Sequence, residues 1–186
     1  MRSFLTSDQR GIARMALSLC LLSLPLTHRE APAAAPSPLC LEQLASLSWC
    51  DLEQLYRQAT PGTIPVGYLR GRAIYCPGAL ISPVRSKLSQ SVWHGKHFCP
   101  SDGILINQWV LRTQAVRARV GYGESWLDGQ PSIVMDYRGM SHVWGNVRDE
   151  MREVASGLYL GVMYRSKGGQ PRMKLFFVLE ACPCSP

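Results

Sequence analysis

Hydrophobic and polar residues alternate in short segments along the C-terminal part of the chain, from residue 114 to residue 180, with turn residues between the segments. In the first segment, Val116, Ala118 and Val120 share one face, whereas Arg117 and Arg119 share the other. This period of two residues is typical of a strand with one buried and one solvated face. The pattern predicts further strands at 132–137, 147–154, 158–164 and 173–179. Five strands joined by short turns indicate an antiparallel meander.

The residues before this meander mix helical and strand patterns. Leucines, Trp49 and Tyr56 recur at helical spacing over 41–58, Ser48 and Asp51 resemble a capping box, and a Pro-Gly pair follows at 61–62. A second helix is expected at about 82–92, and strands at 64–75, 93–98 and 104–110. Together these elements predict a mainly β (α+β) fold, an antiparallel and closed or nearly closed barrel of about eight strands with two or three short helices.

The N-terminus has the three-part layout of a secretory signal. Arg2, Arg10 and Arg14 precede an apolar run at 15–26, and small residues follow at 31–33. We therefore expect cleavage near residue 33 and export to a periplasmic or extracellular space. The apolar run is shorter than the roughly 20 residues that span a bilayer, so no transmembrane segment is expected. The predicted organisation is a signal peptide at 1–33, a helical segment at 34–63 and a barrel-like domain at 64–186 that ends in a Cys-Pro-Cys tail.

The chain is basic, with a formal net charge of +7. Removal of residues 1–33 takes away four of the 20 basic and two of the 13 acidic residues, which leaves a net charge of +5. The remaining basic residues are spread along the predicted strands and loops rather than clustered in the sequence. This spread predicts a solvated basic surface and no nucleic-acid partner.

Six cysteines remain after removal of the predicted signal, and an even number in a short exported chain is typical of disulfide bonds. The candidates are Cys40, Cys50, Cys76, Cys99, Cys182 and Cys184. Six cysteines allow 15 pairings, so the sequence leaves the connectivity open. One arrangement ties the tail to the N-terminal helical segment. A metal site that includes His94, His97 and Cys99 is the alternative, but no second ligand pair has zinc-site spacing, so no metal is expected.

Several short motifs resemble the GXWXG-type bacterial family, with Leu69 at the position of the defining tryptophan. In order, the motifs are Gly67-Tyr68-Leu69-Arg70-Gly71, Trp93-His94-Gly95-Lys96-His97-Phe98, Ile133-Val134-Met135-Asp136-Tyr137, Gly161-Val162-Met163 and Phe176-Phe177-Val178-Leu179. The resemblance covers residues 64–180. It implies a small lipocalin-like, calycin-type barrel without an established activity.

An eight-stranded barrel is either filled by its own side chains or wide enough to hold one small ligand. Aromatic residues and methionine supply the apolar lining with polar handles that is typical of small-molecule pockets. The candidate ligand-binding residues are Trp93, Trp109, Tyr137, Trp144, Tyr159, Met163 and Phe177. The sequence therefore favours an exported protein that binds a hydrophobic or amphipathic molecule, such as a lipid. A structural or interaction module with a filled barrel is an alternative.

The charged segment 148–153 supports a third hypothesis, an enzyme. Alternation places Asp149 and Glu153 on one face, where Arg117 or Arg119 could pair with them if that face points inward. Two carboxylates on one face suit the general acid and base of a hydrolase or isomerase, with Asp149, Glu153 or Asp136 as the candidate residues. The alternative is an edge strand that its charges keep soluble.

No segment carries a specific catalytic or cofactor motif. The segment 123–127 lacks the last glycine of a nucleophile elbow, and no glycine-rich loop precedes a predicted helix. We therefore expect no cofactor, and the oligomeric state is left open.

Overall fold

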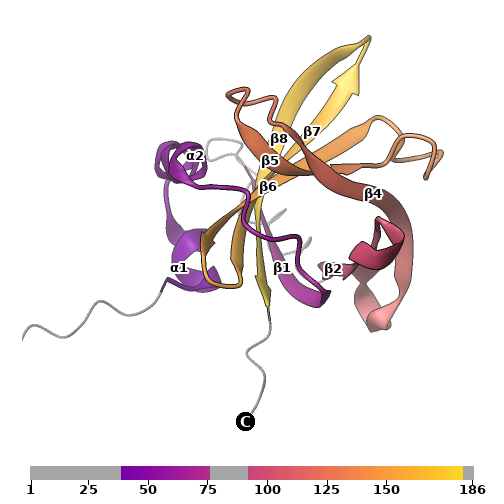
Figure 1. Ribbon diagram of the computed structural model, residues 1–186, viewed down its shortest axis with the longest axis horizontal. Helices are drawn as coiled ribbons and strands as arrows, with labels where there is room; N and C mark the ends of the chain where they lie inside the picture. Colours follow the sequence, from indigo (N-terminus) through magenta and orange to yellow (C-terminus); the bar gives the residue numbers. More distant parts are fainter. Residues whose placement is uncertain (1–38, 76–91, 182–186) are drawn as a thin grey trace, which may run out of the picture. The chain divides into compact units, whose positions relative to one another are not determined.

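The computed structural model describes residues 39–75 and 92–181, and these form an eight-stranded antiparallel β-barrel with two α-helices (Figure 1). The strands are β1 Gly67–Tyr75, β2 Trp93–Cys99, β3 Ile104–Trp109, β4 Gln114–Glu124, β5 Pro131–Asp136, β6 Val147–Ala155, β7 Leu158–Lys167 and β8 Gln170–Ala181. Short 3-10 helices, η1 Pro100–Asp102 and η2 Val110–Arg112, flank β3. The predicted fold class and strand number are confirmed.

The barrel is closed because β1 pairs with both β2 and β8, while every other strand pairs with its neighbours in the chain. The charged strand β6 lies between β5 and β7. The suggestion that residues 148–153 form an edge strand is therefore wrong. Closure gives both sides of each strand a hydrogen-bonding partner, which removes exposed edges.

The helices α1 Leu41–Ser46 and α2 Trp49–Gln58 cover the outer faces of β7 and β8. Ser48 caps α2 as the sequence predicts, since its hydroxyl accepts a hydrogen bond from the backbone N–H of Asp51. One face of the helices buries Leu41, Leu44, Leu52 and Tyr56 against the barrel. They meet the outward side chains of β7 and β8, which include Leu160, Val162, Phe176 and Val178. β7 and β8 are thus buried on both faces.

The start of α1 also meets the end of β8. The backbone N–H of Leu41 donates to Glu180 Oε1 at 3.1 Å, and Arg72 of β1 forms an ion pair with Glu42. The first residues of α1 and the last residues of β8 are therefore neighbours.

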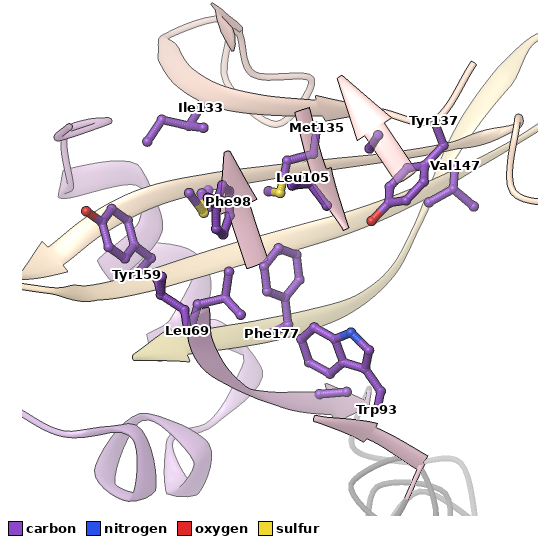
Figure 2. Packing of buried hydrophobic residues seen from close by; sticks show 14 of the residues in the cluster. Leu69, Trp93, Phe98, Leu105, Ile133, Met135, Tyr137, Val147, Tyr159 and Phe177 are labelled. Carbon is purple, nitrogen blue, oxygen red and sulfur yellow. The ribbon is translucent and has the colours of Figure 1, made fainter. Parts of the chain in front are cut away.

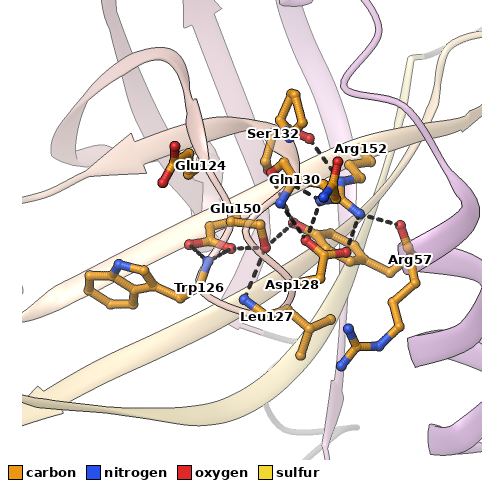
Figure 3. A network of polar contacts seen from close by, with 12 residues as sticks. Arg57, Glu124, Trp126, Leu127, Asp128, Gln130, Ser132, Glu150 and Arg152 are labelled. Carbon is orange, nitrogen blue, oxygen red and sulfur yellow. Dashed lines mark hydrogen bonds and ion pairs between the residues drawn. The ribbon is translucent and has the colours of Figure 1, made fainter.

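A polar cluster joins α2 to the outer face of β6 (Figure 3). The guanidinium of Arg152 is fully buried and donates to both carboxylate oxygens of Asp128, at 2.6 and 2.8 Å, and to the carbonyl oxygen of Tyr56 at 2.9 Å. Glu150 accepts hydrogen bonds from Ser125 Oγ at 2.6 Å and from the backbone of Trp126. The outward charges of β6 thus fasten the β4–β5 connection and α2 to the barrel.

Inward side chains fill one half of the barrel (Figure 2). Leu69, Phe98, Leu105, Ile133 and Tyr159 are all buried in this half. Figure 2 shows Tyr159 on the opposite side of this cluster from Tyr137 and Val147. The other half of the interior contains the cavity described below.

The cysteines depart from the expectation of full pairing. Cys40, Cys50 and Cys99 are free thiols, on α1's N-cap, in the first turn of α2 and at the end of β2. Among the described residues, these three thiols form no disulfide with one another. Cys76, Cys182 and Cys184, the predicted signal at 1–33 and most of the predicted helix at 82–92 lie outside the described residues.

Candidate functional site

A cavity of about 470 Å³ occupies the half of the barrel where β1 ends and β2 begins. Apolar and aromatic side chains make up most of its wall. They are Ala73, Tyr75, Val92, Trp93, Trp109, Val116, Tyr137, Trp144, Val147, Met163, Leu175 and Phe177. The polar lining consists of Lys96, Asn107, Asp149, Arg165 and Lys174. This volume and this mixture are typical of small-molecule pockets.

The buried ammonium of Lys96 lies at the centre of the polar lining. Its Nζ donates to Asn107 Oδ1 at 2.9 Å, to Tyr137 Oη at 2.7 Å and to Asp149 Oδ2 at 2.8 Å. A lysine ammonium has three protons, so these bonds use every donor that it has. Lys96 therefore has neither a proton left for a ligand nor a lone pair for nucleophilic attack.

Asp149 is the member of this cluster with an unused atom. Its Oδ2 accepts from Lys96 and, at 2.9 Å, from the hydroxyl of Tyr137. Its Oδ1 is buried without a hydrogen-bond partner, although the residue is only 5% exposed. A buried carboxylate oxygen that accepts no hydrogen bond is costly, so Oδ1 is the unsatisfied acceptor of this cluster.

Asn107 connects the polar cluster to the backbone of the barrel wall. Its side-chain oxygen accepts from Trp93 Nε1 at 3.1 Å, and its Nδ2 donates to the carbonyl oxygen of Val116 at 2.9 Å. Val116 has a φ of +64°, and the β3–β4 register shifts at this point. A β-branched residue rarely adopts this conformation. The bulge thus turns Val116 towards the cavity, and Asn107 holds it there.

Tyr137 serves as a neutral hydrogen-bond donor in this cluster. Burial raises the pKa of its hydroxyl well above the usual value, and the negative charge of Asp149 raises the pKa further. The phenol therefore keeps its proton and donates it to Asp149 Oδ2, while it accepts from Lys96 and from Asn107 Nδ2.

Positive side chains lie at the outer part of the cavity. Arg165 of β7 and Lys174 of β8 line it, and the Arg165 guanidinium lies 5.5 Å from the ring centroid of Trp144. Arg165 Nε is buried and has no hydrogen-bond partner. Two residues of the cavity wall, Asp149 and Arg165, therefore each have a buried polar atom without a hydrogen-bond partner, namely Asp149 Oδ1 and Arg165 Nε.

The structure brings six of the seven predicted ligand-binding residues to the cavity. Trp93, Trp109, Tyr137, Trp144, Met163 and Phe177 all line it. Tyr159 does not line it, and instead donates to the carbonyl oxygen of Thr63 at 2.9 Å. Tyr159 shares the inward face of β7 with Met163, but lies nearer to the filled end.

The predicted polar residues are scattered. Of the carboxylates, Asp149 lines the cavity, whereas Glu153 accepts from the N–H of Gly157 at the β6–β7 turn and Asp136 accepts from the N–H of Arg138. Arg117 and Arg119 are exposed on β4. The expected pairing of Asp149 with one of these arginines is therefore wrong, because they point to solvent and Lys96 is its partner.

The sequence interpretation missed Lys96, Asn107 and Arg165. Alternation contained a signal for Lys96, because it shares a strand face with the apolar Phe98 in the predicted strand 93–98. Within the described residues, no three His, Cys, Asp or Glu side chains are grouped so that they could hold a metal ion.

No protein-family model matches the chain, and no curated protein matches it. The chain is similar to a crystal structure of a protein from Thermomonospora curvata, with 21% identity and a TM-score of 0.48 over 72% of this chain and 87% of that one. In the described part of the chain, every helix is too short or too polar to cross a bilayer.

Proposed function

We propose that this chain is an exported protein that binds one amphipathic small molecule in the barrel cavity. The observation that carries the proposal is the cavity of about 470 Å³, with a mainly apolar wall and a buried polar cluster that has one unused acceptor. The apolar wall suits the body of the ligand. The secretory layout of residues 1–33 supports export.

The polar atoms of the wall suggest how the ligand is oriented. A hydroxyl or amine of the ligand donates to Asp149 Oδ1, and an acceptor or anionic group faces Arg165 and Lys174. The first contact supplies a hydrogen-bond donor for the unpartnered Asp149 Oδ1, and the second supplies an acceptor or counter-charge for the cations Arg165 and Lys174. A purely apolar ligand would leave Asp149 Oδ1 without a partner, so it would bind more weakly than a ligand that donates to this oxygen.

Binding is favoured over the enzyme hypothesis by the number of carboxylates in the cavity. The enzyme hypothesis rests on two carboxylates as acid and base, and Asp149 is the single carboxylate among the described lining residues. Lys96 is also unsuited to Schiff-base chemistry, since its three donors are all engaged. The filled-barrel hypothesis conflicts with the volume of the cavity.

Native mass spectrometry tests the proposal directly. The chain, with its N-terminal segment, is expressed for export into an oxidising periplasm and purified gently. Its native mass is then compared with its denatured, non-reduced mass. We expect a native excess of a few hundred daltons that organic solvent extracts. A native mass equal to that of the bare chain, together with failure of the probe assay below, would contradict the proposal.

The probe assay uses 1-anilinonaphthalene-8-sulfonate, which combines aromatic rings, an N–H donor and a sulfonate. Val147 is buried in the cavity wall, so Val147→Phe should fill part of the cavity and weaken probe binding about fivefold or more, given an overpacking cost of ~1–3 kcal/mol. Val66→Phe is the matched control, because Val66 is 78% exposed outside the cavity. Equal probe affinity in both variants would place the probe elsewhere.

The orientation is tested without mutation, by displacement of the probe with dodecanol and with its methyl ether. Both have an apolar chain, but dodecanol alone can donate to Asp149 Oδ1. A hydrogen bond to a charged group contributes ~1.5–3 kcal/mol, so the alcohol should compete roughly ten times better or more. Equal competition would reject the Asp149 contact and leave cavity binding intact.

A further inference from the structure

The antiparallel topology gathers three described connections at the open end of the barrel. The β3–β4, β5–β6 and β7–β8 connections all follow odd-numbered strands, so they meet at the end where the cavity lies. We call residues 110–113, 137–146 and 165–174 the mouth face. Figure 1 shows the ribbon of this part of the chain, in red, orange and yellow.

The mouth face is strongly basic. Its exposed cationic side chains are Arg112, Arg138, Lys167, Arg172 and Lys174. The described mouth face contains no acidic residue, and Asp136, which precedes it, accepts from the N–H of Arg138. The connections at the opposite end carry the acidic residues Asp102, Glu124, Asp128 and Glu153 at or beside them. The described connections of the mouth face thus contain cations without carboxylates, whereas those at the opposite end contain carboxylates, of which Asp128 is paired with Arg152.

Aliphatic side chains project from the same face. Val110 is 44% exposed, Leu111 is 89% exposed and Val143 is 76% exposed. Leu111 and Arg112 both have a φ of +57°, a conformation that costs non-glycine residues about 1–2 kcal/mol each. The turn is fixed by hydrogen bonds from Trp109 N–H to Thr113 O at 2.8 Å and from Thr113 N–H to Val110 O at 3.2 Å. A strained but well-bonded turn therefore holds Leu111 in water.

Tryptophans lie directly behind these tips. Trp109, next to Val110, and Trp144, next to Val143, have ring centroids 6.0 Å apart, and both line the cavity. These groups follow the order of layers in a bilayer. The aliphatic tips correspond to the acyl region, the tryptophans to the interface and the surrounding cations to the anionic headgroups.

We propose that the mouth face docks on the surface of an anionic lipid bilayer. The cations contact lipid phosphates, while Leu111 and Val143 enter the acyl boundary. Nucleic acid would satisfy the cations, but it has no apolar phase for exposed aliphatic side chains, so the bilayer is the better match. This inference extends the proposed function, because an amphipathic ligand could then pass between bilayer and cavity without crossing water.

Vesicle flotation tests the inference with the purified protein. Vesicles of phosphatidylcholine alone are compared with vesicles that contain phosphatidylglycerol as well. We expect flotation with the anionic vesicles at low ionic strength and strongly reduced flotation at high ionic strength, because salt screens surface charges. Equal flotation with both vesicle types, or with neither, would overturn the proposal.

Matched variants separate the mouth face from the net charge. Lys167→Glu with Arg172→Glu changes the charge on the mouth face, and Arg117→Glu with Arg119→Glu makes the same change on the exposed face of β4. Each basic residue near an anionic bilayer contributes about a fivefold factor, so the mouth variant should bind more than about tenfold more weakly, and the control should bind like the wild type. Equal losses in both would overturn the proposal.

A third variant tests the aliphatic tips. Leu111→Asn with Val143→Asn keeps every charge, and it should still weaken flotation, whereas binding to a DNA duplex should not change. The DNA duplex is also added to the wild type as a competitor of the anionic vesicles. If the duplex prevents flotation of the wild type, and if the aliphatic variant floats as well as the wild type, the partner is nucleic acid and the proposal is wrong. Binding of 1-anilinonaphthalene-8-sulfonate in the cavity shows whether each variant is folded. A variant that binds this probe but does not float has lost docking alone, whereas a variant that does neither has lost its fold.

Discussion

Among single residues, the ion pair of Lys96 and Asp149 should be the most sensitive to substitution. Both side chains are nearly fully buried, at 2% and 7% exposed, and their atoms lie 2.8 Å apart. Lys96→Met or Asp149→Leu alone leaves one buried charge unpaired, so each should lower the free energy of unfolding by ~3–5 kcal/mol. Urea denaturation measures this change.

The double variant with both substitutions is the control for that prediction. Because it removes both charges, it should be more stable than the sum of the two single losses predicts. Additive losses would show that Lys96 and Asp149 do not depend on each other, contrary to their hydrogen bonds.

Tyr137 should make stability depend on alkaline pH. In the unfolded chain a tyrosine ionises near pH 10, whereas burial raises the pKa of Tyr137 in the folded protein. The unfolded state therefore loses its proton first, and stability that is present below about pH 10 is lost as the pH rises towards the folded pKa. Tyr137→Phe should reduce this loss, as urea denaturation between pH 8 and 11 would measure.

Three other tyrosines limit the size of that effect, and burial also raises the pKa of one of them, Tyr56. Burial raises the pKa of Tyr159 to about 12 and also raises that of Tyr164, so part of the alkaline loss should remain in Tyr137→Phe. Tyr122→Phe is the control, since Tyr122 is 61% exposed. The same alkaline slope in Tyr137→Phe and wild type would argue against a neutral, buried Tyr137.

For single residues, the alternation of apolar and polar positions predicted the inward aromatic residues well, because the backbone of a strand sets its period of two residues. It placed Trp93, Tyr137 and Phe177 where the cavity is. The position along the barrel axis was not predictable, so Tyr159 was grouped with them. Lys96 was missed because a buried lysine depends on partners from elsewhere in the chain, here Asn107 of β3, Asp149 of β6 and Tyr137 directly after β5, and contacts of that kind leave no periodic pattern.

Among the elements, α2 and the β4–β5 connection depend on Arg152 of β6. Hydrogen bonds from Arg152 lower the pKa of Asp128. As the pH falls, the unfolded chain takes up this proton first, so the stabilisation is present above about pH 4 and is lost as the pH falls through the folded pKa. Asp128→Asn should cost ~3 kcal/mol at pH 7, with a smaller difference from wild type below pH 4.

Denaturation at several pH values measures this difference, and Asp102→Asn in the exposed η1 provides the control. Helical circular dichroism that melts before the β-sheet signal in Asp128→Asn would further show that the pair fastens α2. A difference that stays constant from pH 7 to pH 3 would contradict the ionic role of Asp128.

Gly161 of β7 gives the ring of Phe177 its space in the cavity wall. A Cβ atom at Gly161 would lie 2.1 Å from the ring carbon Cζ of Phe177, so the ring must move in Gly161→Ala. Because Phe177 lines the cavity, we expect weaker binding of 1-anilinonaphthalene-8-sulfonate in that variant. The matched control is Gly121→Ala, where no atom lies within 4 Å of the added Cβ. Equal probe affinity in the two variants would show that the ring has room to move elsewhere.

The order of elements was predictable from the sequence, whereas some of their roles were not. The capping pair Ser48 and Asp51 is a local interaction, and it is present as predicted. The charged strand β6 was harder to interpret, because its outward charges are covered by α2 and the β4–β5 connection. A charged strand face that other elements cover has the same sequence pattern as a charged face in water, so the sequence does not distinguish the two.

In the molecule as a whole, the barrel is filled at one end and hollow at the other. Strand number alone allowed either a filled or a hollow interior. The small residue Ala73 lines the hollow half, and Gly161 leaves space beside it for the ring of Phe177. Both effects depend on register, which the sequence did not reveal. The separation of charge between the two ends has the same origin, since it arises from the direction in which each strand runs.

The contact between the start of α1 and the end of β8 makes the fold suitable for circular permutation. Leu41 and Glu180 are hydrogen-bonded, so a short linker in place of both tails could join residue 181 to residue 39. New ends at Gly168 and Gly169, in the β7–β8 turn, would leave all eight strands intact. Such a chain should fold and bind 1-anilinonaphthalene-8-sulfonate like the parent, because its contacts are the same in a different order. Loss of probe binding would show that the order of the strands in the chain, and not only their contacts, is required.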